Sequence, residues 1–317
     1  MFDEIFIVVC SFTVIMGILD NVGKTELMKL SGVKIKLEHL NPSGSVKDRI
    51  AKYIVEKAEK AGLLRKGYTI IEATSGNTGI AFSFVAAVKG YKMVAVMPKG
   101  MSREREQIMR GYGAKVLFSE KGCVKCAVDI AENLAKKPRY YMPRQFENKW
   151  NIEEHENNMG QEILQQAGKV DCFVAGVGTG GTLIGVGKAL RKENTAVNLV
   201  AVEPAECALL SGEGYGSHKI FGLHKGFTCS NHRIEGIGDG FIPKIVEENR
   251  KLIDDVITIK SSEAIEYARK LAKRGYFVGP SSGANFLAAL RLKKKYKNVV
   301  TLFPDRGDRY LSEGIFG

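Results

Sequence analysis

Short apolar runs alternate with longer amphipathic runs along nearly the whole chain. The apolar runs are rich in β-branched residues and predict buried strands at residues 34–37, 69–72, 93–97, 115–118, 171–175, 198–202, 256–259 and 299–303. The runs between them have helical spacing and predict helices at residues 47–61, 78–88, 102–110, 124–135, 182–191, 262–273 and 283–294. Since nearly all-apolar strands alternate with helices, the pattern predicts an α/β fold of mostly parallel sheets covered on both faces.

Three stretches depart from this alternation. Residues 141–156 are polar and aperiodic, which predicts an irregular junction between two domains. Residues 206–240 are rich in Gly, Ser, His and Cys, and so long a loop in a compact α/β protein is usually functional. Residues 5–19 carry no charge but are shorter than the roughly 20 residues of a membrane-spanning helix. Because acidic residues precede them, a signal peptide is not expected either, and a buried strand or arm and a wrongly assigned start codon both stay open.

The composition is that of an ordinary soluble globular protein, with 44% hydrophobic and 26% charged residues in a chain of 317. The net charge of +12 arises from Lys and Arg scattered among acidic residues, as in Lys52, Glu56 and Lys57. Because no basic stripe interleaved with aromatic residues is present, we expect a solvated basic surface and no nucleic-acid partner. The positive electrostatic potential of such a surface mildly favours an acidic or phosphorylated small substrate.

Six cysteines stand at positions 10, 123, 126, 172, 207 and 229. They are too sparse for a disulfide framework in a chain of this length and suit a reducing cytoplasm. Cys123 and Cys126 have the spacing of half a zinc site or of a redox pair. No second Cys or His pair stands at ligand spacing, so we expect no metal, and we expect these two cysteines to be ordinary helix residues.

A glycine-rich loop joins the predicted strand 171–175 to the predicted helix 182–191, with the sequence Gly176-Val177-Gly178-Thr179-Gly180-Gly181-Thr182. Glycines let the main chain approach an anion, and the N–H groups at a helix start supply positive potential, so the loop predicts a phosphate site. The spacing also matches the dinucleotide fingerprint, with Glu203 at the end of the next strand. On this motif alone, a nicotinamide dinucleotide is an equally good ligand.

Lys47 falls in the first turn of a predicted helix, after the residues 41–45, which can cap it. The positive end of the helix dipole costs an ammonium group roughly 0.3–1 kcal/mol, and the same field favours a neutral, nucleophilic amine. On position alone, a solvated surface lysine is the better interpretation of Lys47.

Two further loops combine glycine with hydroxyl side chains, at residues 72–79 (EATSGNTG) and 279–284 (GPSSGA). Hydroxyl and N–H donors at the start of a helix suit a carboxylate. Together with residues 41–47 and the glycine-rich loop, they predict one ligand held from several sides at the carboxyl edge of a sheet.

In order along the chain, these motifs resemble the cysteine synthase family, that is, the O-acetylserine sulfhydrylases and cystathionine β-synthases of the tryptophan-synthase-β class of pyridoxal phosphate enzymes. The matching segments are Asn-Pro-x-x-Ser-Val-Lys47-Asp-Arg, Thr74-Ser-Gly-Asn-Thr78, Gln145-Phe-x-Asn148, Gly178-Thr-Gly-Gly-Thr182 and the tail at 303–312. They cover the chain from about Gly23 onward. The resemblance implies a cofactor site made by Lys47, Asn77, Gly178, Thr179, Gly180, Gly181, Thr182 and Ser281. It implies substrate-binding residues Thr74, Ser75, Gly76, Thr78 and Gln145.

The resemblance further implies that Lys47 forms a Schiff base with pyridoxal 5'-phosphate and then removes the substrate's α-proton. Asn77 would contact the ring hydroxyl and Ser281 the pyridine nitrogen. The implied reaction is β-replacement on O-acetylserine or O-phosphoserine, with sulfide or another thiol, to give cysteine or a related amino acid. The implied fold has two three-layer αβα domains, residues 1–150 and 151–317, with residues 20–40 crossing to the second domain and the cofactor in the cleft. A cytoplasmic homodimer, with serine acetyltransferase as a partner, is also implied.

Three segments depart from the family's usual sequence: residues 23–27 (GKTEL), residues 148–152 (NKWNI) and residues 223–233. They lie near regions that the family uses for substrate access, so the leaving group and the nucleophile stay open. The alternatives are a serine-type cystathionine β-synthase, a serine/threonine dehydratase, a regulator that keeps the cofactor without activity and, from another class, an NAD(P)-dependent oxidoreductase.

Overall fold

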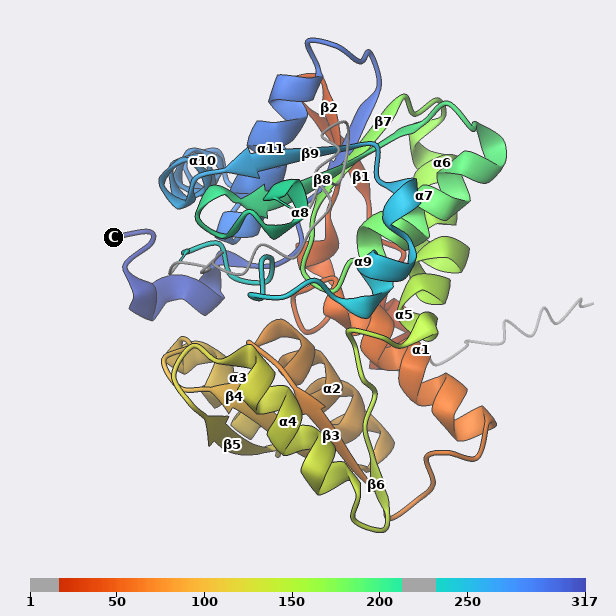
Figure 1. Ribbon diagram of the computed structural model, residues 1–317, viewed down its shortest axis with the longest axis vertical. Coiled ribbons are helices and arrows are strands. Elements are labelled where there is room, and N and C mark those ends of the chain that lie inside the picture. Colours follow the sequence, from red (N-terminus) through yellow and green to blue (C-terminus); the bar gives the residue numbers. More distant parts are fainter. Residues whose placement is uncertain (1–16, 213–231) are drawn as a thin grey trace, which may run out of the picture.

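The computed structural model describes residues 17–212 and 232–317, which fold into two lobes, each built around one sheet (Figure 1). The larger sheet has the strand order β1-β2-β10-β7-β8-β9, and the smaller has the order β5-β4-β3-β6. The strands are β1 Leu27–Leu30, β2 Val33–Lys36, β3 Thr69–Ala73, β4 Lys92–Pro98, β5 Lys115–Ser119, β6 Tyr140–Tyr141, β7 Cys172–Gly176, β8 Asn198–Pro204, β9 Asp255–Ile259 and β10 Val299–Leu302.

Helices cover both faces of each sheet (Figure 1). They are α1 Lys47–Lys60, α2 Asn77–Lys89, α3 Arg103–Gly111, α4 Val124–Ala135, α5 Lys149–Glu154, α6 Gly160–Ala167, α7 Gly181–Glu193, α8 Leu209–Gly212, α9 Lys244–Glu248, α10 Ser261–Ala272 and α11 Pro280–Leu292. Short 3₁₀ turns are η1 Ile18–Asn21, η2 Glu38–Leu40, η4 Ala205–Cys207, η5 Arg250–Leu252 and η6 Gly307–Glu313, and η3 His155–Met159 is a π-helical turn.

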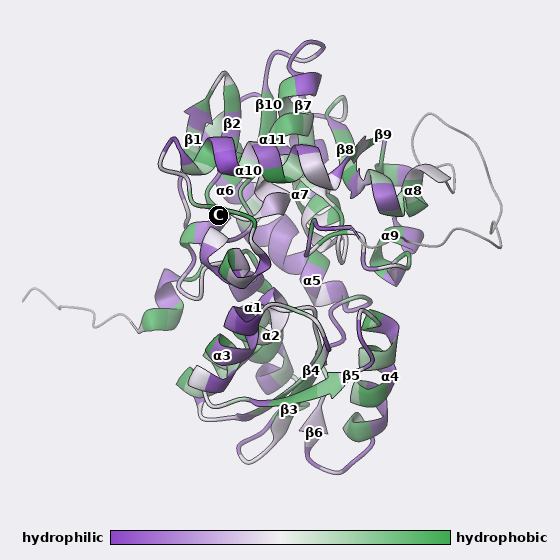
Figure 2. Ribbon diagram, turned by 90° about the vertical axis from the view of Figure 1, so that its left-hand side faces the viewer, coloured by the Kyte–Doolittle hydropathy of each residue, from purple (hydrophilic) through white to green (hydrophobic). Residues whose placement is uncertain are grey.

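Strand pairing is parallel throughout both sheets except in the β1–β2 hairpin. The strand β2 pairs with β10, so this early part of the chain belongs to the larger sheet. The apolar cores follow the sheets, and green predominates in the larger strands of Figure 2, such as β5. The predicted α/β class with mostly parallel sheets is confirmed.

The expectation of an irregular segment at 141–156 is wrong in its second half. Asn148 caps a helix there, since its side-chain oxygen accepts the N–H of Trp150 at 2.9 Å, and helical structure then continues through α5, η3 and α6. The polar appearance of this stretch reflects buried polar residues, Asn151, Glu154 and His155, that are used in internal contacts.

The expectation of ordinary, unpaired cysteines in the helix is also wrong. Cys123 and Cys126 are joined by a disulfide at the start of α4, and Cys207 is disulfide-bonded as well. Cys10, Cys229 and most of the apolar segment 5–19 lie outside the described residues, as does most of the loop 206–240. Within the described ranges, no helix has the length and apolar character needed to cross a membrane.

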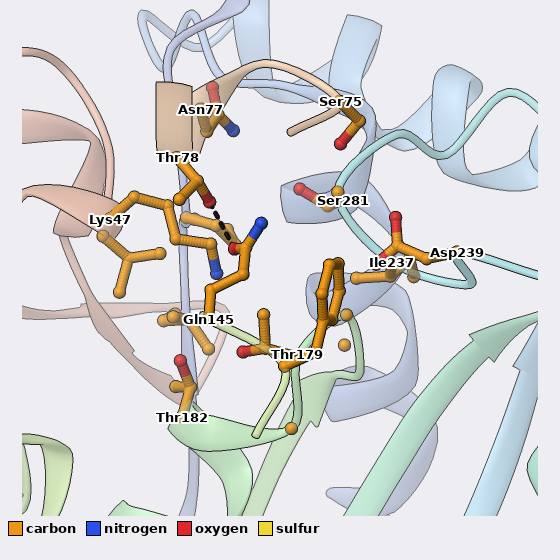
Figure 3. Close-up of a pocket in the computed structure, with 18 of the residues that line it drawn as sticks. Lys47, Ser75, Asn77, Thr78, Gln145, Thr179, Thr182, Ile237, Asp239 and Ser281 are labelled. Atoms are coloured by element: carbon orange, nitrogen blue, oxygen red, sulfur yellow. Dashed lines mark hydrogen bonds between the residues drawn. The ribbon is translucent and has the colours of Figure 1, made fainter. Parts of the chain in front are cut away.

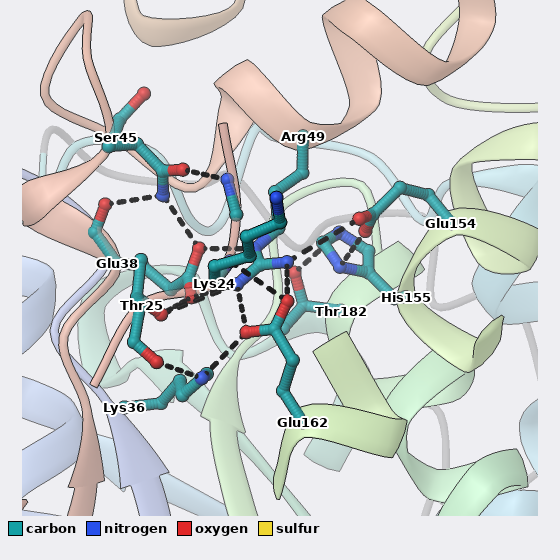
Figure 4. Close-up of polar contacts among 12 residues, drawn as sticks. Lys24, Thr25, Lys36, Glu38, Ser45, Arg49, Glu154, His155, Glu162 and Thr182 are labelled. Carbon is teal, nitrogen blue, oxygen red and sulfur yellow. Dashed lines mark hydrogen bonds and ion pairs between the residues drawn. The ribbon is translucent and has the colours of Figure 1, made fainter. Parts of the chain in front are cut away.

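A buried network of charges ties α1 to the larger lobe (Figure 4). Arg49 donates from Nε to Glu38 at 2.6 Å and from Nη2 to Glu162 of α6 at 2.8 Å, and Lys36 of β2 pairs with Glu162 at 2.7 Å. Although burial acts in the opposite direction, these cations hold the pKa of Glu162 at about 2. Because Arg49 lies in the same helical turn as Lys47, the network fixes the start of α1 to the larger lobe.

Candidate active site

A cavity of about 60 Å³ lies where the two lobes meet (Figure 3). Four helices begin at its wall: α1 with Lys47, α2 with Asn77, α7 with Thr182 in its first turn and α11 with Ser281 in its first turn. Helix starts carry unpaired N–H groups and positive potential, so the cavity is suited to anionic groups.

Most of the predicted site residues line this cavity: Lys47, Ser75, Asn77, Thr78, Gln145, Gly178, Thr179, Gly180, Thr182 and Ser281. Thr74, Gly76 and Gly181 are not part of the wall, but each is next in sequence to a residue that is. The sequence patterns therefore identify one location, although their segments lie far apart along the chain.

The side chain of Lys47 reaches into the cavity (Figure 3). Desolvation lowers the pKa of its amine, while the carboxylates of Asp239 and Asp305 oppose part of that effect. The neutral amine is the nucleophilic form, so the surroundings of Lys47 favour attack on a carbonyl carbon.

The loop between β3 and α2 is shaped by Thr74. Its Oγ1 accepts the N–H groups of Gly76 at 2.9 Å and of Gly79 at 3.0 Å. Gly76 has a φ of +154°, and Arg105 packs against it where a β-carbon would stand. This arrangement leaves Ser75 and Thr78 on the cavity wall.

Gln145 closes the cavity beside this loop. Thr78 Oγ1 donates to Gln145 Oε1 at 2.6 Å, and Gln145 Nε2 donates to the carbonyl of Ala73 at 2.9 Å. Behind it, the main-chain N–H of Gln145 donates to Glu72 at 3.4 Å. Burial raises the pKa of Glu72 to about 8, so this carboxyl is protonated at neutral pH.

The glycine-rich loop forms the opposite wall. A β-carbon at Gly178 would collide with the main-chain oxygen of Gly236, and one at Gly181 would collide with Asn151. Gly180 has a φ of +84°, which glycine adopts without strain. Asn151 Nδ2 donates to the Gln145 carbonyl at 2.9 Å and to Thr179 Oγ1 at 3.1 Å, so it couples the two walls.

Asn77 is held at both ends by the segment that follows β10. Its amide nitrogen donates to Asp305 at 2.6 Å, and its oxygen accepts from Arg309 at 2.7 Å. Asp305 also accepts from the hydroxyl of Tyr310 at 2.6 Å. These contacts fix the orientation of the Asn77 side chain at the cavity.

On α11, Ser281 is 3% exposed, and Asn285 lines the cavity one turn further along. Asn285 accepts the N–H of Gly176 at 2.8 Å and donates to the carbonyl of Leu302 at 3.1 Å. It therefore fixes α11, and Ser281 with it, to the ends of β7 and β10.

Two charged residues at the cavity were not identified from sequence. Burial raises the pKa of Asp239, and the nearby Lys47 opposes this effect. Arg105 is 2% exposed and forms ion pairs with Glu235 and Glu313. Asp239 lies in the loop 206–240, which the sequence indicates to be functional without singling out this residue, whereas Arg105 lies on a strongly polar helix whose pattern gives no sign of burial.

Glu203, the acidic residue of the dinucleotide interpretation, is engaged elsewhere. Its carboxylate accepts the N–H of Leu210 at 2.8 Å, the N–H of Ser211 at 2.9 Å and the Ser211 hydroxyl at 2.6 Å. A carboxylate with three such donors is not free to bind a ribose, so the nicotinamide alternative loses its main support.

The cavity fits pyridoxal phosphate in its donor set. The start of α7, with Thr179 and Thr182, suits the phosphate, and the glycines there leave the main chain open to it. The desolvated Lys47 amine suits the aldehyde, and Asn77 and Ser281 supply neutral polar groups for the ring.

Comparison with known proteins gives the same result. Residues 18–305 match the family described as pyridoxal-phosphate dependent enzyme. A cysteine synthase of Staphylococcus aureus is 44% identical over 310 residues, covering 93% of this chain and 95% of that protein.

Solved structures are similar as well. An O-acetylserine dependent cystathionine β-synthase from Helicobacter pylori is 38% identical, with a TM-score of 0.86 over 96% of this chain and 99% of that one. A cysteine synthase from Entamoeba histolytica is 36% identical, with a TM-score of 0.84 over 99% and 94% of the two chains. The chain therefore belongs to the pyridoxal-phosphate dependent enzyme family and is of the cysteine synthase type.

Proposed function

We propose that this protein catalyses β-replacement on O-acetylserine, with sulfide or another thiol as the nucleophile and L-cysteine or a related amino acid as the product. The observation that carries the proposal is the desolvated amine of Lys47, which shares one cavity with the hydroxyl-rich loop and with the glycine-rich start of α7. The reaction requires three parts of the protein: a nucleophilic lysine, a loop that binds the substrate carboxylate and a loop that binds the cofactor phosphate.

Bound pyridoxal phosphate supplies an electron sink that acidifies the substrate's α-carbon and lets the β-substituent leave. The protein's own groups do the rest. Ser75, Thr78 and Gln145 bind the substrate carboxylate, and Asn77 and Ser281 orient the ring. The Lys47 amine takes the α-proton, for which a lowered pKa is suitable because the amine must be neutral to accept it.

The charges at the cavity bear on the donor. Lys47 and Arg105 are the cationic side chains in its wall within the described residues, and Arg105 is already paired with Glu235 and Glu313. Asp239 adds a carboxylate. A phosphorylated serine would therefore find no free cation beyond Lys47 itself. The local charges favour O-acetylserine, in contrast to the expectation from the net charge of +12.

The test is an assay of the purified protein with O-acetylserine and sulfide, followed by detection of cysteine. Lys47→Ala is expected to abolish turnover and the visible absorbance of the lysine-bound cofactor. Lys60→Ala, at the exposed end of the same helix, is the matched control and should retain both. Turnover with O-phosphoserine that exceeds turnover with O-acetylserine would refute the donor assignment and leave the reaction class intact.

The finer expectations follow from the same likeness. We propose a cytoplasmic homodimer that binds serine acetyltransferase, with domains at residues 1–150 and 151–317 and the segment near 20–40 contributing to the second. Light scattering during gel filtration measures the dimer directly, and a pull-down with purified acetyltransferase measures the partner.

A further inference from the structure

The disulfide between Cys123 and Cys126 is a feature that the proposed reaction does not use. It lies where β5 turns into α4, on the smaller lobe, and both cysteines are partly exposed. Small molecules in solvent can therefore reach the pair.

The residues on either side of Cys123 line a cavity that adjoins the active site. A second cavity, of about 180 Å³, shares Ser75, Gly236, Ile237 and Asp239 with the active-site cavity. We call it the vestibule. Gly122, Val124 and Met101 form part of its wall. The turn that carries the disulfide is thus one side of a space that adjoins the active-site cavity.

Hydrogen bonds connect the disulfide turn to the neighbouring wall of the vestibule. The N–H of Gly122 donates to the carbonyl of Lys99 at 3.2 Å, and the N–H of Lys99 donates to the carbonyl of Ser119 at 3.3 Å. Ser119 Oγ in turn donates to the carbonyl of Cys123 at 3.2 Å. Because Met101 lies two residues after Lys99, a shift of the disulfide turn also moves the Met101 side of the vestibule.

The two sulfur atoms are chemically unequal. Cys123 is the N-cap of α4, and its Sγ accepts the N–H of Cys126 at 3.1 Å, an arrangement that stabilises a thiolate. Cys126 Sγ lies 3.9 Å from the carboxylate of Glu120, which disfavours a thiolate. In thiol–disulfide exchange, the sulfur with the more stable thiolate leaves faster. Cys123 is therefore the leaving sulfur and Cys126 the sulfur that is attacked.

We propose that Cys123 and Cys126 form a reversible thiol–disulfide site, reduced by small thiols and reoxidised by small disulfides, whose oxidation state sets the width of the vestibule. An incoming thiolate attacks Cys126 Sγ, forms a mixed disulfide there and releases the Cys123 thiolate. A second thiolate attacks the sulfur of the small thiol in that mixed disulfide, which yields a small disulfide and a Cys126 thiolate. Two electrons pass from two thiols to the protein. Thiols of this class are also the nucleophiles and products of the proposed reaction.

The chemical part is tested without any activity measurement. The cofactor-loaded protein is equilibrated with mixtures of reduced and oxidised glutathione, alkylated and digested. The mass of the peptide that carries both cysteines is then measured by mass spectrometry. The expected result is a reversible two-electron transition. In Cys126→Ser the remaining Cys123 should be alkylated at lower pH than Cys126 is in Cys123→Ser. A pair that stays in one oxidation state throughout, or the opposite order of alkylation, overturns the proposal.

The second part is tested by kinetics on protein held in each oxidation state. Reduction is expected to change KM for the amino-acid donor by about fivefold, the lower end of typical coupling between two sites, with kcat nearly unchanged. Cys126→Ser should give one KM under both conditions. The KM measurement rests on the proposed function, whereas the alkylation experiment does not. The two experiments can therefore fail separately. An identical KM in both states of the wild-type protein refutes control of the vestibule.

Discussion

The amide nitrogen of Asn77 donates to the carboxylate of Asp305 across 2.6 Å, although 228 residues separate the two. Asn77 begins α2 of the smaller lobe, and Asp305 follows the last strand of the larger sheet. Arg309 holds the other end of the same amide. The amide that we propose to face the cofactor ring is therefore positioned by the opposite lobe, and we expect cofactor binding to depend on how the lobes are held together.

Asp305→Asn tests this relationship. The variant loses a charged acceptor shared by Asn77 and Tyr310, a contact of a kind that contributes about 1.5–3 kcal/mol. We expect cofactor affinity, measured by titration of the visible absorbance, to fall by at least about tenfold. Asp308→Asn removes the same charge at an exposed position and should bind the cofactor as the wild type does. Equal affinity in both variants would show that the Asp305 contact does not position Asn77.

Gly178→Ala tests the glycine-rich loop. The added methyl group would meet the main-chain oxygen of Gly236, which cannot move as a side-chain end can, and such overpacking typically costs about 1–3 kcal/mol. We expect a matching loss of cofactor affinity with little change in circular dichroism. The control is Gly111→Ala, because no atom lies near that position. Unchanged affinity in Gly178→Ala would place the phosphate elsewhere.

The buried carboxyl of Glu72 should make the stability of the protein depend on pH. Burial raises the pKa of Glu72 from 4.5 to about 8, so its stabilising contribution is complete below pH 4.5 and is lost as the pH rises through about 8. Glu72→Gln carries an uncharged side chain at every pH. We therefore expect the Tm of the wild type to fall by about 5 °C or more relative to the Tm of the variant as the pH rises from 4.5 to about 8. The measurement is thermal unfolding across this range, with the exposed Glu193→Gln as the control. Parallel curves for wild type and Glu72→Gln would contradict the prediction.

Arg49→Leu tests the network that holds α1. The change leaves the carboxylate of Glu38 buried without its cation, and breaking such a pair costs about 3–5 kcal/mol. Chemical denaturation should show this loss, whereas Arg65→Leu, at an exposed position, should stay within about 0.5 kcal/mol of the wild type. If both variants are equally stable, the network does not anchor the helix that begins at Lys47.

Much of the fold is visible in the sequence because the central strands are apolar on both faces. Each strand predicted from such a run is present, for example β4 and β8. The strand β1, with the sequence LMKL, is short and contains a lysine, so its hydrophobic pattern does not predict a strand. The helices from Lys149 to Ala167 were missed because their buried faces carry Asn151, Glu154 and His155, which look like surface residues in a one-dimensional pattern.

The site was visible to the extent that its parts are local. Glycine-rich loops and helix starts are formed by consecutive residues, as in 74–78 and 176–182, so a sequence pattern can identify them. The supporting contacts of Asp305, Arg309 and Asn151 join distant segments, and no spacing rule encodes them. The disulfide was missed for a different reason. The spacing Cys123-x-x-Cys126 is common to a zinc half-site, a redox pair and an ordinary helical turn, and the lack of a second ligand pair argues only against zinc, whereas the chemistry of the pair depends on its place at a helix start.

Attachment of the cofactor to Lys47 is tested most directly by reduction of the purified, cofactor-loaded protein with borohydride, followed by digestion and mass spectrometry. We expect a pyridoxyl-phosphate label on Lys47, with loss of the visible absorbance in step with labelling. A label on another lysine, or no label on a protein that still turns over substrate, would contradict it.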